Sequence, residues 1–262
     1  INSAKDATYA EATSSLPTTG TYTLLVGDGF WGSGTGDYNL YLQRLNDPAA
    51  SSPLSFGEVV SGTIQLSAEM AAYTFSADAR DEILVGTSPT SGFIWPEVRL
   101  YDPDGLLVDS ASDVNHAEIA VGLSTTGTHT LLVGDGFNGT ETGDFNLYAQ
   151  RLNSPGNATP LSFGDLVSGG ILKAAEMDTY TFSASGGDQV RVGISRTSGG
   201  FWPEVRLYEP DGALIDAAHD STYAELTETL PASGTYAILC GDGLNGSSIG
   251  DYDLQLEKLS PP

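Results

Sequence analysis

Pairs of aspartates nine residues apart are the residues of this chain best placed to do chemistry. They lie near the two ends of glycine-rich stretches that begin at residues 27 (GDGFWGSGTGDYN), 134 (GDGFNGTETGDFN) and 241 (GDGLNGSSIGDYD). The six carboxylates are Asp28, Asp37, Asp135, Asp144, Asp242 and Asp251. Ca²⁺ takes about six to eight oxygens from carboxylates, carbonyls and water, and glycine lets a short loop curl so that carbonyls converge. If the flanking strands form a hairpin, each pair meets and could bind Ca²⁺.

A second interpretation of these stretches needs no metal. Glycine adopts turn conformations, and aspartate side chains accept hydrogen bonds from nearby backbone amides in Asx turns. The spacing matches neither an EF-hand loop nor a calcium-binding nonapeptide repeat. The sequence leaves both interpretations open. A further acidic pair recurs as Asp6 with Glu11, Asp113 with Glu118 and Asp220 with Glu225; it is a weaker metal candidate than the loops, and a solvated edge is a sufficient explanation.

The same loops carry sequences that fit the acceptor pattern for N-glycosylation. They are Asn138-Gly-Thr and Asn245-Gly-Ser at two loop tips, and Asn157-Ala-Thr in a joint between repeats. We note them as candidate glycosylation sites, although a chain so rich in Ser and Thr produces such triplets by chance.

Catalytic motifs are not found in the sequence. His116 and His129 occupy positions where the other copies have Tyr, which indicates packing, and Cys240 stands where the other copies have Val26 and Val133. There is no nucleophile elbow, zinc-binding helix motif or phosphate loop. We therefore expect a protein that is not an enzyme.

The charge of the chain excludes several classes of partner. Its 262 residues include 34 acidic and 10 basic side chains, for a net charge of −24. Such a surface repels nucleic acid and anionic lipid, and no run is long and apolar enough to span a membrane. We expect no nucleic-acid partner and no membrane insertion.

The aspartate loops belong to a repeat of 107 residues. LPTTGTYTLLVGDGF begins at residue 16, LSTTGTHTLLVGDGF at 123 and LPASGTYAILCGDGL at 230. A period of this length matches a small domain. We divide the chain into unit 1 (1–49), unit 2 (50–156) and unit 3 (157–262). Ile1 aligns with Val108 and Ile215, so unit 1 has only the C-terminal half of a repeat. We expect upstream sequence to supply the other half; donation by another subunit is the alternative.

Within unit 2 the sequence predicts short strands at 54–60, 63–67, 71–77, 81–88, 96–102, 106–111, 116–121, 127–134 and 144–152. Phe145, Leu147 and Ala149 alternate with polar or outward positions, which is typical of a strand that covers a core on one face. YDPDGLL (101–107) predicts a tight hairpin. The expected fold is all-β: tandem antiparallel β-sandwiches, jelly-roll-like, joined by short proline-containing links.

The order of these motifs resembles the bacterial pre-peptidase C-terminal (PPC) domain. The matching segments are GEVVSGTIQLSAEMAAYTFSADARDEILVG, VRLYDPDGLLV, LSTTGTHTLLV and TGDFNLYAQRL. The resemblance covers both full units and the half unit. It implies secreted or surface proteins with a jelly-roll-like sandwich and non-catalytic roles beside proteases or in adhesive arrays; related collagen-binding modules carry calcium. This chain departs at Ala71, where Asp178 of unit 3 fits the family pattern.

These observations predict a structural or adhesive protein. The expectation is an extracellular or cell-surface filament, stalk or surface layer on a bacterium, built from tandem, calcium-stabilised sandwiches by self-association or within a longer array. The alternative is a non-catalytic accessory module of a secreted enzyme that binds a matrix protein or glycan.

Overall fold

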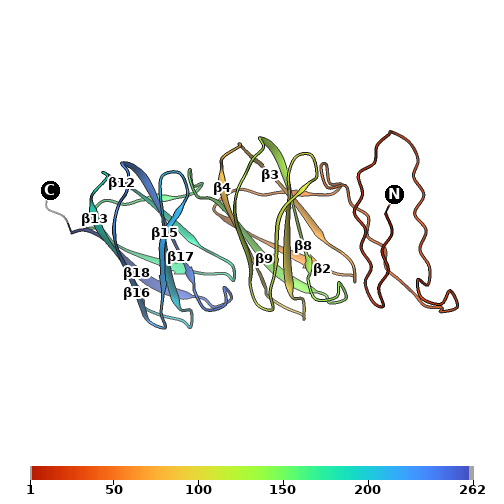
Figure 1. Ribbon diagram of the computed structural model, residues 1–262. Helices are drawn as coiled ribbons and strands as arrows, with labels where there is room; N and C mark the ends of the chain where they lie inside the picture. Colours follow the sequence, from red (N-terminus) through yellow and green to blue (C-terminus); the bar gives the residue numbers. More distant parts are fainter. Residues whose placement is uncertain (1, 260–262) are drawn as a thin grey trace.

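Two β-sandwiches of the same topology make up most of the molecule (Figure 1). The computed structural model describes residues 2–259, and its regular structure in that range consists of 18 strands without a helix. Strands β1–β9 form the sandwich of unit 2 and β10–β18 that of unit 3. The prediction of an all-β fold of tandem β-sandwiches is confirmed.

In unit 2 a five-stranded sheet faces a four-stranded one. The first has the order β1-β3-β8-β5-β6 and the second the order β2-β9-β4-β7. The strands are β1 (Ser52–Pro53), β2 (Glu58–Ile64), β3 (Ala71–Ala77), β4 (Glu82–Pro89), β5 (Pro96–Tyr101), β6 (Leu107–Ser112), β7 (Ala117–Gly122), β8 (Gly127–Asp135) and β9 (Gly143–Arg151). The prediction of two strands at 54–60 and 63–67 is wrong. A single strand, β2, includes residues 61 and 62 between them, and β1 is a short parallel partner of β3.

Unit 3 repeats this arrangement with the orders β10-β12-β17-β14-β15 and β11-β18-β13-β16. Its strands are β10 (Thr159–Pro160), β11 (Leu166–Ile171), β12 (Asp178–Ala184), β13 (Gln189–Arg196), β14 (Pro203–Tyr208), β15 (Leu214–His219), β16 (Tyr223–Thr229), β17 (Gly234–Asp242) and β18 (Gly250–Lys258). The pairing registers are also displaced by one repeat: Val98 lies opposite Val133 in unit 2, and Val205 opposite Cys240 in unit 3.

The core of each sandwich lies between its two sheets, as the strand alternation predicts. Phe145, Leu147 and Ala149 of β9 have no exposed surface, because their side chains point between the sheets. His129 stacks on Phe75 with ring centroids 5.5 Å apart, which confirms its packing role. The predicted hairpin joins β5 to β6, and Gly105 supplies the positive φ of 80° that the turn requires.

Residues 2–47 form no strand, although they repeat the sequence of β7, β8 and β9. In unit 2 those three strands never pair with one another: β7 pairs with β4, β8 with β3 and β5, and β9 with β2 and β4. Every strand partner comes from the first half of the repeat. The assignment of residues 1–49 as half of a repeat remains a prediction, and Ile1 lies outside the described residues.

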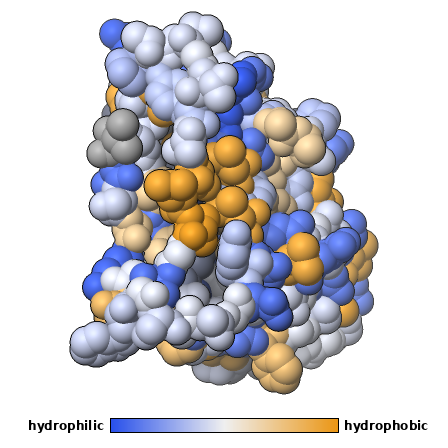
Figure 2. Space-filling model, turned by 90° about the vertical axis from the view of Figure 1, so that its right-hand side faces the viewer, coloured by the Kyte–Doolittle hydropathy of each residue, from blue (hydrophilic) through white to orange (hydrophobic). Residues whose placement is uncertain are grey.

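The apolar side chains of unit 1 therefore lie open at one end of the molecule. Leu24 and Leu40 are each 57% exposed, whereas their equivalents in unit 2, Leu131 and Leu147, are fully buried. Figure 2, which views this end, shows apolar side chains gathered in its centre.

The units stack sheet against sheet. The outer face of the four-stranded sheet of unit 2 contacts the outer face of the five-stranded sheet of unit 3, where Leu84 and Tyr148 belong to one buried cluster with Tyr208 and Leu239. Figure 1 shows the three units in a row. We call this contact region the junction between units 2 and 3, and equivalent side chains meet between units 1 and 2, where unit 1 contributes no sheet.

Candidate functional site: the junctions between repeats

The aspartate loops cross between sheets and do not close hairpins. Asp135 ends β8 in the five-stranded sheet, and Asp144 lies at the start of β9 in the four-stranded sheet. The same holds for Asp242 and Asp251. The hairpin that would bring each pair of carboxylates together is therefore absent from both units.

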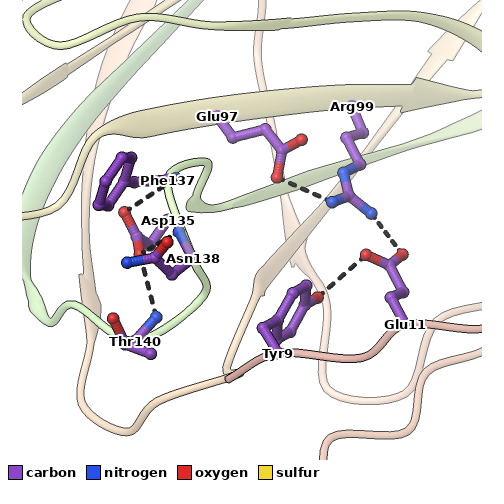
Figure 3. Close-up of polar contacts among 8 residues, drawn as sticks. All are labelled: Tyr9, Glu11, Glu97, Arg99, Asp135, Phe137, Asn138 and Thr140. Atoms are coloured by element: carbon purple, nitrogen blue, oxygen red, sulfur yellow. Dashed lines mark hydrogen bonds and ion pairs between the residues drawn. The ribbon is translucent and has the colours of Figure 1, made fainter. Parts of the chain in front are cut away.

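The first aspartate of each loop organises the loop through its backbone amides. The carboxylate of Asp135 accepts hydrogen bonds from five backbone N–H groups, including that of Trp95 at 3.1 Å. Figure 3 shows its contacts with Phe137, Asn138 and Thr140, the last at 3.0 Å. Asp242 accepts four such bonds. At Asp28 the N–H groups of Gly34 and Phe30 lower the pKa of the carboxyl to about 2. This is the Asx-turn chemistry of the second interpretation.

The second aspartate accepts bonds from hydroxyl groups. Thr63 and Ser91 donate to opposite oxygens of Asp144, each at 2.7 Å, and Ser198 donates to Asp251 at 2.6 Å. The equivalent Asp37 lies in an exposed part of unit 1.

These surroundings do not fit a calcium ion. N–H and O–H hydrogens point at the oxygens that a cation would need, and no group of three or more acidic, histidine or cysteine side chains within residues 2–259 is placed to hold a metal. Binding itself is not tested by this geometry, so calcium at the aspartate loops stays a prediction.

The loop tips contact the neighbouring unit. Gly139, with φ of 66°, lies against the ring of Tyr9, where an added Cβ would come within 2.6 Å. One repeat later Gly246, with φ of 62°, lies equally close to the ring of His116. The glycine at the tip is thus required twice: for its backbone conformation and for the close approach of the next unit.

An ion-pair triad of the same composition lies beside each tip. Between units 2 and 3, Arg206 donates to Glu118 of the preceding unit at 2.7 Å, and pairs with Glu204 of its own unit at 3.0 Å. Between units 1 and 2, Arg99 contacts Glu11 and pairs with Glu97 at 2.9 Å (Figure 3). Tyr9, which lies against the glycine at the loop tip, also donates a hydrogen bond to Glu11 at 3.0 Å.

The triad between units 2 and 3 is partly desolvated. Arg206 and Glu118 are 17% and 25% exposed. Burial raises the pKa of the Glu118 carboxyl, but the hydrogen bond from His116 and the charge of Arg206 outweigh it, and the pKa falls to about 2. Burial alone would lower the pKa of Arg206, whereas Glu118 and Glu204 raise it. Both groups are therefore charged at neutral pH, and the pair bridges the units.

Apolar residues surround the triads and also repeat. Between units 2 and 3 they come from the four-stranded sheet side of unit 2 and the five-stranded sheet side of unit 3. Between units 1 and 2 the strandless residues of unit 1 take the first part, and the five-stranded sheet side of unit 2 takes the second. The equivalent pairs are Tyr41 and Tyr148, Leu45 and Leu152, Met70 and Met177, Tyr101 and Tyr208, and Leu132 and Leu239.

The joints are tied to the same surface by a glutamine. Gln150 donates to the carbonyl of Gly156 at 3.0 Å and accepts from its N–H at 3.0 Å. In unit 1, Gln43 makes the same two contacts with Ala49, at 3.1 and 3.0 Å. The proline-containing joints are thus held against the preceding unit, which restricts them beyond what their composition predicts.

The junction residues were only partly indicated by the sequence. Glu118 belongs to the recurring acidic pair for which a solvated edge was one explanation, and it is instead partly buried against Arg206. Its counterpart Glu11 pairs with Arg99 but stays exposed. The uninterrupted apolar run Ile83-Leu84-Val85 could have indicated the junction from the sequence. All three residues are fully buried, which requires cover on both faces of the four-stranded sheet.

Other predicted site residues lie in different surroundings. Asn138 and Asn245 are half-buried at the loop tips. Asn157 is exposed, but its side chain donates to the carbonyl of Gly57 at 3.3 Å. Glycosylation of the three asparagines stays a prediction. Cys240 is fully buried, as expected for a position that is Val in the other copies. Within residues 2–259 no helix has the length and apolarity to cross a bilayer.

Comparison with known proteins yields structural similarities only. No family model and no curated protein matches the chain. Among solved structures, the pre-peptidase C-terminal domain of a collagenase from Bacillus anthracis is 16% identical, covering 40% of this chain and 98% of that one, with a TM-score of 0.34. The g-type lysozyme inhibitor PliG from Aeromonas hydrophila is 18% identical, covering 38% and 95%, with a TM-score of 0.33. PliG from Salmonella Typhimurium is 24% identical, covering 39% and 99%, with a TM-score of 0.31.

Proposed function

We propose that this protein is a non-catalytic structural component of an extracellular or cell-surface array, in which β-sandwich repeats stack into a stiff rod. The observation that carries the proposal is the recurrence of one junction. The triads Glu11–Arg99–Glu97 and Glu118–Arg206–Glu204 lie one repeat apart, each beside a glycine tip and an apolar cluster.

A repeated junction fixes the relation of each unit to the next. In repeat proteins stability is a sum of terms within each repeat and between nearest neighbours. Here each between-unit term combines buried apolar surface, a bridging ion pair and a tethered joint. A rod of this kind transmits force or spaces other domains, and it would self-associate or continue within a longer array.

Small-angle X-ray scattering of the chain tests the proposal. We expect a profile that fits a single extended arrangement of units 2 and 3. The variant Arg206→Ala should give a profile that requires an ensemble, while Arg44→Ala, which removes an exposed pair with Asp47, should not change it. A wild-type profile that already requires freely moving units would contradict the proposal. Imaging of the native assembly then distinguishes a regular filament from separated beads.

One surface of unit 2 supports the second candidate, a module that binds a glycan or a matrix protein. Trp95 and Phe137 lie with ring centroids 4.5 Å apart and are 41% and 56% exposed. Aromatic rings that stay open to solvent bind sugars and apolar protein segments. The expected result is that Trp95→Ala weakens binding to a polysaccharide or collagen panel. Trp202→Ala is the matched control, because Leu244 stands there in place of Phe137. Equal binding by wild type and both variants would remove this candidate.

A further inference from the structure

We infer that the outer face of the four-stranded sheet of unit 3 is a terminating face, which does not accept another repeat in the geometry of the two junctions. The inference rests on the proposed stacking function. It concerns β11, β18, β13 and β16, whose counterparts in unit 2 form the preceding side of the junction.

Two central apolar residues of the junction are polar on this face. Arg191 of β13 stands where β4 has Leu84, and Gln255 of β18 stands where β9 has Tyr148. Leu84 and Tyr148 are 0% and 1% exposed in the cluster that unit 3 covers. A repeat docking on unit 3 would instead have to desolvate an arginine and an amide at the centre of the contact.

Arg191 also forms an ion pair with the glutamate to which the arginine of a following unit would have to bind. Glu225 is the equivalent of Glu118, but it pairs with Arg191 of its own unit at 3.3 Å. Arg191 further pairs with Glu257 at 2.7 Å. An incoming arginine equivalent to Arg206 would therefore meet a neutralised carboxylate and a like charge, and like charges facing each other across an interface favour dissociation.

The glutamine that holds the joint against the preceding unit is absent from unit 3 as well. Glu257 replaces Gln150, and a carboxylate has no N–H with which to hold a backbone carbonyl of the joint. Its Oε1 accepts a bond from Gln255 at 2.8 Å, so the substituted residues form their own network.

The substitutions agree in direction. The face keeps the fold of the repeat and the Tyr223–Glu225 contact. The side chains that would contact a following unit, however, are replaced by charged and polar side chains that pair with one another and face water. Repeat arrays require terminal faces of this polar kind to remain soluble. Stacking is therefore directional: it proceeds to unit 3 and stops at its outer face.

A chain extended by one more repeat tests this inference. Residues 153–262 are copied and attached after Leu259 of the full chain, which supplies the native joint and a unit whose five-stranded face is the one docked in the 2–3 junction. A second version carries Arg191→Leu, Gln255→Tyr and Glu257→Gln in the inner copy of unit 3. Spin labels at Ser183 and its copy report the new contact.

Labels at Ser76 and Ser183, the same position in units 2 and 3 and exposed in both, report the native junction in the same chain as a reference. We expect a narrow distance distribution for the reference, a broad one across the unmodified face and a narrow one at the reference distance across the substituted face. A narrow distribution across the unmodified face, or a broad one across the substituted face, overturns the inference. A broad reference distribution instead contradicts the stacking proposal itself.

Discussion

Residues 10–44 of unit 1 and residues 117–151 of unit 2 are identical at 24 of 35 positions and adopt different structures. In unit 2 this segment forms β7, β8 and β9, while in unit 1 it forms none of them. The difference lies in the partners, since each of these strands pairs only with β2, β3, β4 or β5. Because the two halves interleave, the segment that forms β7, β8 and β9 has no strand partner of its own.

The side of unit 1 that faces unit 2 is nevertheless organised. Glu11, Tyr41 and Leu45 make the junction contacts that Glu118, Tyr148 and Leu152 make one repeat later. Two kinds of contact therefore organise a repeat independently: strand pairing within a sandwich, and side-chain contact with the next unit.

The largest effect is expected from a core substitution placed in both segments. Leu131→Ala empties a fully buried position between the sheets and should destabilise unit 2 by about 2–5 kcal/mol. Leu24→Ala, at the equivalent but 57% exposed position, should leave the unfolding of unit 2 unchanged. Urea unfolding followed by the fluorescence of Trp95, with Trp31 and Trp202 replaced by Phe, measures both. An equal loss from the two variants would mean that unit 1 has a formed core.

Removal of the bridging arginine is expected to act on contact between units and not on pairing within them. Arg206→Ala leaves Glu118 and Glu204 partly buried without a cation, at a cost of about 1–3 kcal/mol. Arg99→Ala should instead release Glu11 and its neighbours from unit 2. Amide hydrogen exchange resolves the two sites. Faster exchange in β13 or β18, which lie in the sheet of unit 3 that faces away from unit 2, would contradict a role of Arg206 confined to the junction.

Acid should open the junction between units 2 and 3 in a defined range. The pKa of Glu118 is lowered from the usual 4.5 to about 2 in the folded protein. Because the folded pKa lies below the unfolded one, the contribution is complete above pH 4.5 and is lost as the pH falls toward 2. Spin labels at Ser76 and Ser183 should show broadening in this range. Glu118→Gln should remove that pH dependence, and broadening of the same size in this variant would assign the effect to other carboxyls.

The smallest effect concerns the aspartate loops, where the calcium prediction can be decided. If an ion is bound, a chelator lowers the melting temperature of unit 2, and Asp135→Ala with Asp144→Ala removes most of that sensitivity. Loss of the amide contacts of Asp135 should lower stability in either case, so the informative quantity is the chelator-dependent difference. Identical melting curves of the wild type with and without chelator exclude the ion.

The sequence by itself determined the repeat, the all-β class and the faces of individual strands. The 107-residue period is visible in the printed letters, and the alternation of Phe145, Leu147 and Ala149 identifies core positions because a strand turns successive side chains to opposite faces. Glycine and aspartate likewise indicated tight loops organised by backbone hydrogen bonds.

Only the tertiary structure decided what lies against the other faces. Alternation says that Tyr148 points away from its own core, but not that Tyr208 and Leu239 of the next unit cover it. The placement of β8 and β9 in different sheets likewise excludes the hairpin that was expected to join Asp135 and Asp144. Both outcomes depend on partners that are remote in the sequence, and local residue preferences carry no information about such partners.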